Sequence, residues 1–269
     1  MSESKKNKDS MRNVIVVSLL ICFACSVVVS SAAVLLKPQR IANKELDKNK
    51  NILEAAGLYD RETAASNTDI PALFSNFEIH LVDLQEKHML SESEALELGI
   101  DVRTFDQRKA SKDPSQSKAL STQEDIASIS RRARYSVIYL LRDQGEISKA
   151  VVPIHGYGLW STLYGFVALE ADMNTVSGIT FYEHGETAGL GGEVDNPKWK
   201  GSWPGKKIYD GDKVGLKVIK GVANPSSQTY GYEIDGLSGA TITSRGVENL
   251  VSYWMGKDGF GPVLDEIKG

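Results

Sequence analysis

The feature that most constrains this chain is an uncharged apolar run near its start. Residues 14–36 read VIVVSLLICFACSVVVSSAAVLL, with Arg12 before the run and Lys37 after it. A helix of 23 residues at about 1.5 Å per residue reaches roughly 35 Å, which exceeds a bilayer core of about 30 Å. The sequence therefore predicts a transmembrane anchor over 14–36, between a tail of residues 1–13 and a domain of residues 37–269.

A cleaved secretory signal is the competing interpretation, because Ser30 to Ala33 are small residues of the kind that signal peptidase accepts. The run is longer than the apolar core of a signal peptide and continues through Leu36, so we expect an uncleaved anchor. Basic residues flank both ends, and their count does not fix the orientation. A short tail before a long domain is typical of an anchor whose large domain is exported.

Both cysteines of the chain, Cys22 and Cys25, lie in this run with CxxC spacing. On a helix in lipid they fall one turn apart, where small polarizable side chains pack well. We expect them to pack; a metal or cluster shared with partner subunits is the alternative.

The rest of the chain has the composition of an ordinary globular domain. A net charge of −4 and a pI near 5.7 supply no cationic field for phosphates, so we expect no nucleic-acid partner. No GxGxxG follows a predicted strand and no GxxxxGK[ST] occurs, which removes the common NAD(P) and P-loop signatures.

The hydrophobic pattern after the anchor predicts an α+β domain, largely an antiparallel sheet with flanking helices. A short helix over 51–57 ends at Gly57, the segment 71–83 passes from helix to strand, and the polar stretch 87–129 forms helices or a surface excursion. The last helix is expected from about Thr243 to Met255. Strands are expected at 136–141, 150–154, 164–170, 175–183, 213–219 and 230–234.

Glycine is concentrated in the later half, where 21 of 24 glycines lie between Gly156 and Gly269. Three glycine-rich segments with aromatics or hydroxyls stand out: HGYGLWSTLYG (155–165), EHGETAGLGG (183–192) and DGLSGATITS (235–244). A planar phosphorylated ligand requires such close backbone approach, apolar walls and phosphate donors. For any one segment alone, a tight turn between strands is the favoured interpretation, whereas three such segments in one half of the chain favour a ligand site.

The third segment places Ser238, Gly239, Ala240 and Thr241 just before the last predicted helix. A helix N-terminus offers unpaired N–H groups and partial positive charge, both of which favour a phosphate. A plain N-cap at Thr243 or Ser244 is the alternative. No GxSxG elbow or hydrolase triad accompanies the segment, so we expect no catalytic residues of that kind.

These residues resemble a known family. Asp235, Ser238, Gly239, Ala240 and Thr241 match the flavinylation motif D-x-x-S-G-A-T of FMN-binding domains, in which a flavin transferase esterifies the final hydroxyl to the FMN phosphate. The resemblance extends through GLWS, EHGETAGLGGEVDNPKW, NILEAAGLYD, FEIHLVDL and DIASISRRARYSVIYLL. Over nearly its whole length, the chain is similar to the family of C subunits of sodium-translocating NADH:quinone oxidoreductases.

The resemblance implies which residues handle FMN. Thr241 would carry it as a phosphoester, and Asp235 and Ser238 would be recognised by the transferase or shape the turn. The other implied cofactor-binding residues are Gly239, Ala240 and Thr243 at the same motif, Glu186, Thr187, Gly189 and Leu190 against the isoalloxazine, and Leu159, Trp160 and Ser161 on its other side. Ala188 stands where the family usually has proline, for which we expect a slightly more flexible loop.

The resemblance further implies a function. The chain would relay electrons from an iron–sulfur centre to a flavin in a neighbouring subunit of a sodium-pumping NADH:ubiquinone reductase. It would be a single-pass protein of the bacterial inner membrane, with residues 37–135 preceding an extracytoplasmic FMN-binding core of residues 136–269. Its partners would be the other membrane subunits and, during maturation, the flavin transferase.

Two other functions remain open. One is that of the G subunit in an Rnf-type electron transport complex, against which the long segment 37–129 counts. The other is an anchored sensory or scaffold domain that binds FMN without electron transfer. We expect no metal site, because His184 and Glu186 lack a third clustered ligand; His184 is expected to order its loop through hydrogen bonds.

Overall fold

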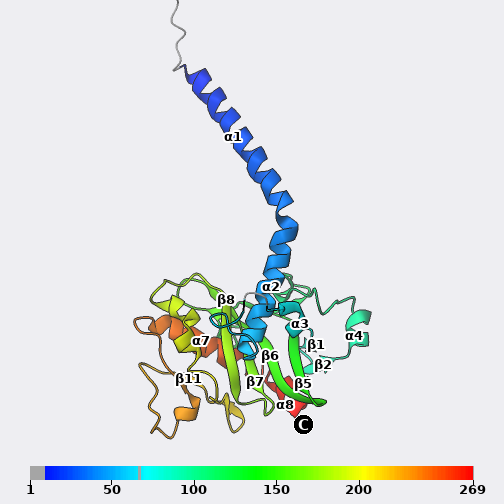
Figure 1. Ribbon diagram of the computed structural model, residues 1–269, viewed down its shortest axis with the longest axis vertical. Coiled ribbons are helices and arrows are strands. Elements are labelled where there is room, and N and C mark those ends of the chain that lie inside the picture. The colour runs from blue at the N-terminus through cyan, green and yellow to red at the C-terminus, as the bar shows by residue number, and fades with distance from the viewer. Residues whose placement is uncertain (1–9, 66–67, 269) are drawn as a thin grey trace, which may run out of the picture. The chain divides into compact units, whose positions relative to one another are not determined.

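The computed structural model describes residues 10–65 and 68–268, and the chain divides into two compact units, Met1–Leu46 and Asp47–Gly269. The first unit contains α1 (Met11–Leu35), whose residues are all exposed (Figure 1). Among the described residues, α1 is the one helix long and apolar enough to cross a membrane. The helix predicted from the uncharged run is confirmed.

The helix α2 (Lys37–Ala55) is separated from α1 by one residue, Leu36, and finishes in the second unit. Gly57 has φ +71°, its N–H donates to the Glu54 carbonyl, and the N–H of Leu58 donates to the Leu53 carbonyl. These two bonds form a Schellman motif, which satisfies the last carbonyls of the helix. The predicted glycine stop is confirmed, but it ends a helix of 19 residues rather than a short one.

A six-stranded sheet with the order β2-β1-β5-β6-β7-β8 forms the centre of the second unit, and all neighbouring strands are antiparallel (Figure 1). Its strands are β1 (Phe77–Asp83), β2 (His88–Leu90), β5 (Tyr135–Asp143), β6 (Glu146–Tyr157), β7 (Thr162–Glu170) and β8 (Val176–Glu183). Residues before and after position 135 therefore share one sheet. The predicted α+β class, with an antiparallel sheet behind an N-terminal apolar helix, is confirmed.

Short elements connect and cover this sheet. The helices are α3 (Ile70–Phe74), α4 (Glu92–Glu97), α5 (Gln107–Lys112), η1 (Gly191–Asp195), α6 (Pro197–Lys200), η2 (Tyr230–Tyr232), α7 (Thr241–Trp254) and α8 (Gly261–Lys268). The short strands are β3 (Ser117–Ala119), β4 (Arg131–Ala133), β9 (Tyr209–Asp210), β10 (Lys213–Val214), β11 (Lys217–Val218) and β12 (Glu233–Ile234).

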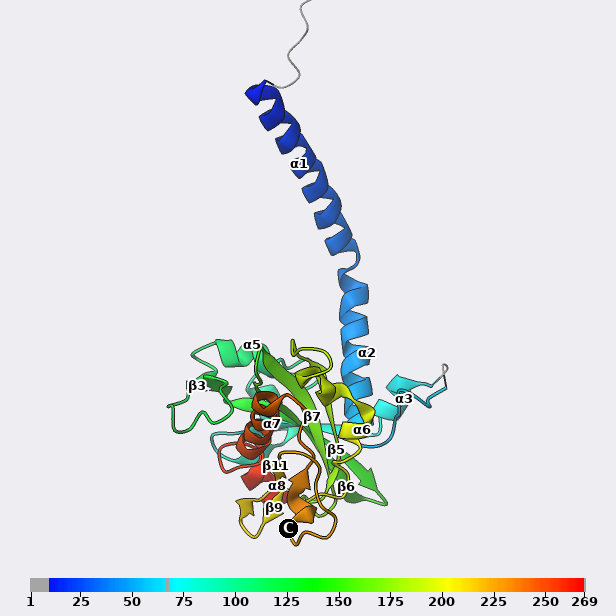
Figure 2. The same cartoon turned by 90° about the vertical axis from the view of Figure 1, so that its left-hand side faces the viewer.

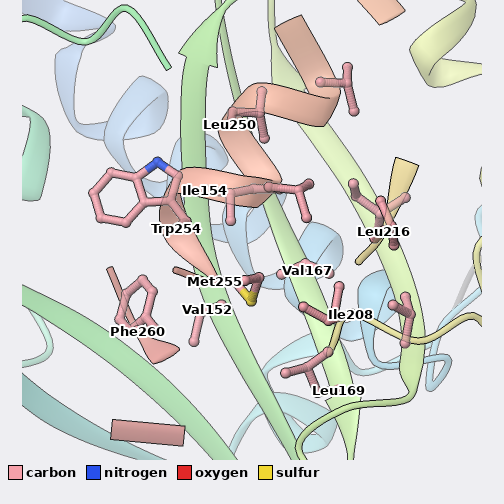
Figure 3. Packing of buried hydrophobic residues seen from close by; sticks show 14 of the residues in the cluster. Val152, Ile154, Val167, Leu169, Ile208, Leu216, Leu250, Trp254, Met255 and Phe260 are labelled. Carbon is pink, nitrogen blue, oxygen red and sulfur yellow. The ribbon is translucent and has the colours of Figure 1, made fainter. Parts of the chain in front are cut away.

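One face of the sheet packs against α7. Alternate residues of β6, including Val152 and Ile154, point toward this helix and form one hydrophobic cluster with Leu250 and Trp254 (Figure 3). Gly156 continues this face, and a Cβ on it would lie 2.6 Å from the Leu250 Cβ. The α7 backbone therefore sits very close to the end of β6.

The other face of the sheet packs against the end of α2 (Figure 2). A Cβ on Gly178 of β8 would lie 2.5 Å from the Ala55 carbonyl oxygen, and the Thr180 hydroxyl donates to the Asn51 carbonyl oxygen at 3.1 Å. Ile52 and Leu53 are fully buried there. The sheet is thus covered by helices on both faces.

Two predicted strands are wrong. The run 213–219 is broken because the N–H groups of Gly215 and Leu216 both point to the Ile208 carbonyl, which leaves β10 and β11 as separate two-residue strands. In 230–234, only Glu233 and Ile234 form a strand, and it pairs parallel to β11. Tyr and Ile favour strands by packing on a sheet, but the residues before Glu233 close a 3₁₀ turn instead.

Candidate functional site

The turn that carries the D-x-x-S-G-A-T motif is held from both sides. The Asp235 carbonyl oxygen accepts the Trp199 indole N–H at 2.8 Å, and its carboxylate Oδ1 accepts the Ala223 N–H at 2.8 Å. Gly236 follows with no room for a side chain, because a Cβ would lie 2.1 Å from the Ile219 carbonyl oxygen. Asp235 therefore fixes the start of the motif against the loop around residue 221.

The second half of the motif is open to solvent. Ser238, Gly239 and Thr241 are exposed, and Gly239 has φ +72°, a conformation that glycine adopts at little cost. The chain then enters α7 at Thr241, two residues earlier than the sequence predicted. Ala240 is the N-cap residue and provides no side-chain hydrogen bond, so the first N–H groups of α7 lack a capping acceptor.

Neither alternative N-cap is correct. Both hydroxyls lie inside the first turn of α7 and are buried. Thr243 donates to the Glu186 Oε2 at 2.6 Å, and Ser244 accepts the Leu237 N–H at 3.0 Å. The hydroxyl side chains of this turn attach α7 to the neighbouring loops, which leaves its N-terminus free for a ligand.

Glu186 connects the three glycine-rich segments. Its side chain is 9% exposed, and its Oε1 accepts the backbone N–H groups of Leu159, Trp160 and Ser161 at 3.1, 2.9 and 3.2 Å. With Oε2 on Thr243, one carboxylate ties the 158–161 loop to the start of α7. The side chain thus lies beneath the surface of the site.

The protonation state of Glu186 follows from these contacts. Burial alone would raise the pKa of the carboxyl group. The hydrogen bonds from the Thr243 hydroxyl and from the N–H groups of the 159–161 backbone outweigh burial and lower the pKa below its ordinary value. Glu186 is therefore a carboxylate at neutral pH.

His184 orders the same loop. Its Nδ1 accepts the Glu186 N–H at 3.2 Å, so the proton lies on Nε2, which donates to Asp195 at 2.8 Å. The Ser161 hydroxyl accepts the Gly185 N–H at 2.6 Å and joins the loop to its neighbour. The predicted ordering role of His184 agrees with these bonds. Across residues 10–65 and 68–268, no group of three or more His, Cys, Asp or Glu side chains is placed to hold a metal.

An apolar rim of exposed side chains lies on the motif and on the two loops that Glu186 ties to it. Trp160 is 65% exposed and Leu190 44% exposed, and a Cβ on Gly239 would lie 3.0 Å from the Leu190 Cδ2. Leu159 and Ile242 are also exposed, and Ile242 directly follows Thr241. Large apolar side chains gathered on a surface mark a ligand or partner site. Ile242 is absent from the residues predicted for the site, although its place next to Thr241 at a helix N-terminus was a signal for it.

The arrangement fits the chemical demands of FMN. An uncapped helix N-terminus beside an exposed hydroxyl suits the phosphate, and the apolar rim suits the isoalloxazine. In the segment 183–192, the exposed residues include Thr187, Gly189 and Leu190. In the segment 155–165, they include Leu159 and Trp160. Glu186 and Thr243 differ, because their side chains point into the structure.

Comparisons with known proteins agree with this assignment. Residues 158–256 match the sequence model of the FMN-binding domain. The C subunit of the Na(+)-translocating NADH-quinone reductase from Pseudomonas aeruginosa is 47% identical over 97% of this chain and 98% of its own length. This chain belongs to the family of C subunits of Na(+)-translocating NADH-quinone reductases. The C subunit from Pasteurella multocida is 45% identical over 98% of this chain and 96% of its own length.

Solved structures of C subunits share the fold. NqrC from Shewanella oneidensis superposes with a TM-score of 0.73 at 33% identity, covering 84% of this chain and 99% of that chain. The C subunit from Parabacteroides distasonis, at 24% identity and a TM-score of 0.61, covers 85% of this chain and 96% of that chain. The family predicted from the motifs is confirmed.

Proposed function

We propose that the chain is the C subunit of a sodium-translocating NADH:quinone reductase and carries FMN covalently on Thr241. The observation that carries this proposal is the exposed Thr241 hydroxyl at the first position of α7, an N-terminus without a side-chain cap. The partial positive charge of that N-terminus stabilises a phosphate there. Of the three functions open at the sequence level, the full-length match to C subunits favours this one.

The chain's residues divide the work of holding FMN. Backbone N–H groups at the start of α7 bind the phosphate, while Ser238 and Gly239 shape the approach to it. Leu159 and Trp160 on one loop, and Thr187, Gly189 and Leu190 on the other, enclose the ring and limit its contact with water. FMN supplies the redox chemistry. Asp235 holds the motif, and Glu186, Ser161 and Thr243 hold the loops.

Attachment needs a separate enzyme. In the proposed step, the Thr241 Oγ1 bonds to the phosphorus of an activated flavin nucleotide, the bond from phosphorus to the leaving group breaks, and the hydroxyl proton is released. No electrons are transferred. We propose that a flavin transferase catalyses this step on the exposed half of the motif. The covalent bond keeps the flavin on a domain outside the cytoplasm, where free FMN is scarce.

In the assembled complex, we propose that the FMN relays electrons between an iron–sulfur centre and a flavin in neighbouring membrane subunits. α1 would anchor the chain in the bacterial inner membrane, with residues 1–13 in the cytoplasm and residues 37–269 outside it. The FMN-binding core would span residues 136–269. The sodium pathway would lie in partner subunits, since one transmembrane helix does not enclose an ion pathway.

The test is covalent labelling in cells that also express a flavin transferase. The wild-type chain should give a band that fluoresces under ultraviolet light on a denaturing gel, and its intact mass should exceed the polypeptide by one FMN less one water. Thr241→Ala should abolish both signals, because it removes the acceptor oxygen, whereas Thr241→Ser retains an oxygen and should keep them. Thr229→Ala, which changes an exposed threonine outside the motif, is the matched control. A dark wild-type band with the bare polypeptide mass would refute the attachment.

A further inference from the structure

We propose that Glu186 is a positioning residue that builds the flavin site before any flavin arrives, rather than a residue that contacts the ring. This inference rests on the proposed function. The Glu186 carboxylate accepts four hydrogen bonds from two different parts of the chain. Oε1 accepts three consecutive backbone N–H groups, from Leu159 to Ser161, and Oε2 accepts the Thr243 hydroxyl.

Three consecutive N–H groups aimed at one oxygen require a curved backbone. Such a curve brings N–H dipoles together and is stabilised by an anion at its centre. Glu186 supplies that anion from within the chain. The Gly158 N–H also closes this loop on the Ser161 carbonyl oxygen at 2.8 Å, and the Glu186 carboxylate is the charged acceptor that fixes the three consecutive N–H groups, in the loop from which Leu159 and Trp160 are exposed.

The space around the carboxylate is built for it. A Cβ on Gly158 would lie 2.7 Å from Oε1, and a Cβ on Gly191 would lie 2.6 Å from both Oε2 and the Thr243 Oγ1. Both glycines are buried. One glycine from each loop thus allows the carboxylate to sit between the loops and the first turn of α7.

The link to Thr243 sets the geometry of the acceptor. Thr243 and Thr241 share the first turn of α7, so the bond from Thr243 to Glu186 fixes the position of the Thr241 backbone relative to both loops. The negative charge of Glu186 also stabilises its contact with the start of α7, because a carboxylate near a helix N-terminus is favourable. Glu186 therefore couples the acceptor turn to the loop that carries Trp160.

The first readout uses the full chain in detergent micelles, prepared without flavin transferase. Amide hydrogen exchange of the 159–161 segment should be at least about tenfold faster in Glu186→Ala than in wild type, because the N–H groups lose their charged acceptor. Glu186→Gln keeps one acceptor oxygen and should give an intermediate rate. Glu193→Gln removes a carboxylate whose bond goes to Asn196, and should leave the segment unchanged.

The second readout uses the flavin-loaded chain. Visible circular dichroism of the bound flavin should weaken in Glu186→Ala and Thr243→Val but not in Thr243→Ser, which restores the hydroxyl, or in Glu193→Gln. Unchanged exchange at 159–161 in Glu186→Ala would overturn the proposal, as would exchange that rises equally along β6 and β7. If exchange at 159–161 rises in Glu186→Ala as expected but the wild-type chain never accepts FMN from the transferase, the positioning role is supported and only the proposed function is refuted.

Discussion

Gly158 and Gly191 show how the site depends on single residues. Both belong to the glycine-rich segments whose composition predicts close approach to a ligand. In the fold, the group that approaches them is the Glu186 carboxylate of the chain itself. A methyl group at either position would have to displace that carboxylate, and the three N–H groups that it binds would then lose their acceptor.

Asp235 offers a sharp test at the residue scale. Asp235→Asn keeps an oxygen that accepts the Ala223 N–H, whereas Asp235→Ala removes it. Because we assign Asp235 to the shape of the turn, Asn should retain most flavin attachment and Ala should lose most of it. The measurement is in-gel flavin fluorescence per amount of protein after coexpression with the transferase. Equal loss in both variants would show instead that the transferase reads the negative charge.

At the scale of elements, α7 joins the motif to the sheet. Its first turn carries Thr241, and its last turn carries Trp254, whose indole N–H donates to the His155 carbonyl oxygen at 2.7 Å. The His155 ring lies between two aromatic rings, with centroid distances of 4.7 Å to Trp254 and 5.5 Å to Tyr164. The α7–β6 contact that supports the site is therefore partly aromatic.

His155 makes this contact sensitive to pH. Burial lowers its pKa from 6.5 to about 4, and the nearby positive charge of Arg108 adds to the effect. In the unfolded chain the imidazole titrates near its ordinary pKa of about 6.5. Its contribution to stability is complete above that value and is lost as the pH falls toward 4, because protons then favour the unfolded chain.

The expected size of this loss is about 3 kcal/mol in the free energy of unfolding. Urea unfolding of the full chain in detergent, repeated between pH 7 and pH 4, measures it. His155→Phe keeps an aromatic ring and should make the slope between pH 7 and pH 5 shallower, while His88→Gln should retain it. Nearer pH 4, carboxyl groups with a lowered pKa, such as Asp83, add a slope that both proteins share. A slope that is the same in wild type and His155→Phe would assign the effect to other groups.

The whole molecule combines an apolar N-terminal helix that is long enough to cross a membrane with a domain that matches the FMN-binding family. The average amino-acid composition of the chain describes neither part, since α1 is apolar and exposed while the second unit has its own buried core. The cysteines, Cys22 and Cys25, are exposed on α1. Packing against lipid or partner helices remains our expectation for them.

We expect residues 37–269 to lie on the outer side of the bacterial inner membrane. A C-terminal fusion to alkaline phosphatase, which folds only outside the bacterial cytoplasm, should be active in intact cells, and a fusion to green fluorescent protein exported by the same route should be dark. Deleting residues 1–36 should reverse both results. An inactive phosphatase fusion of the full chain would place the domain in the cytoplasm.

The long apolar N-terminal helix, the α+β class, the glycine stop at Gly57 and the motif that ends in Thr241 could all be predicted from the sequence. Each of these depends on near neighbours in the chain, through hydrophobic period, local backbone conformation or an unbroken motif. Other features came only with the folded chain. Ile208 splits a predicted strand, and Glu186 binds residues that are 25 to 57 positions away. Such bonds leave no local pattern, because folding alone brings their partners together.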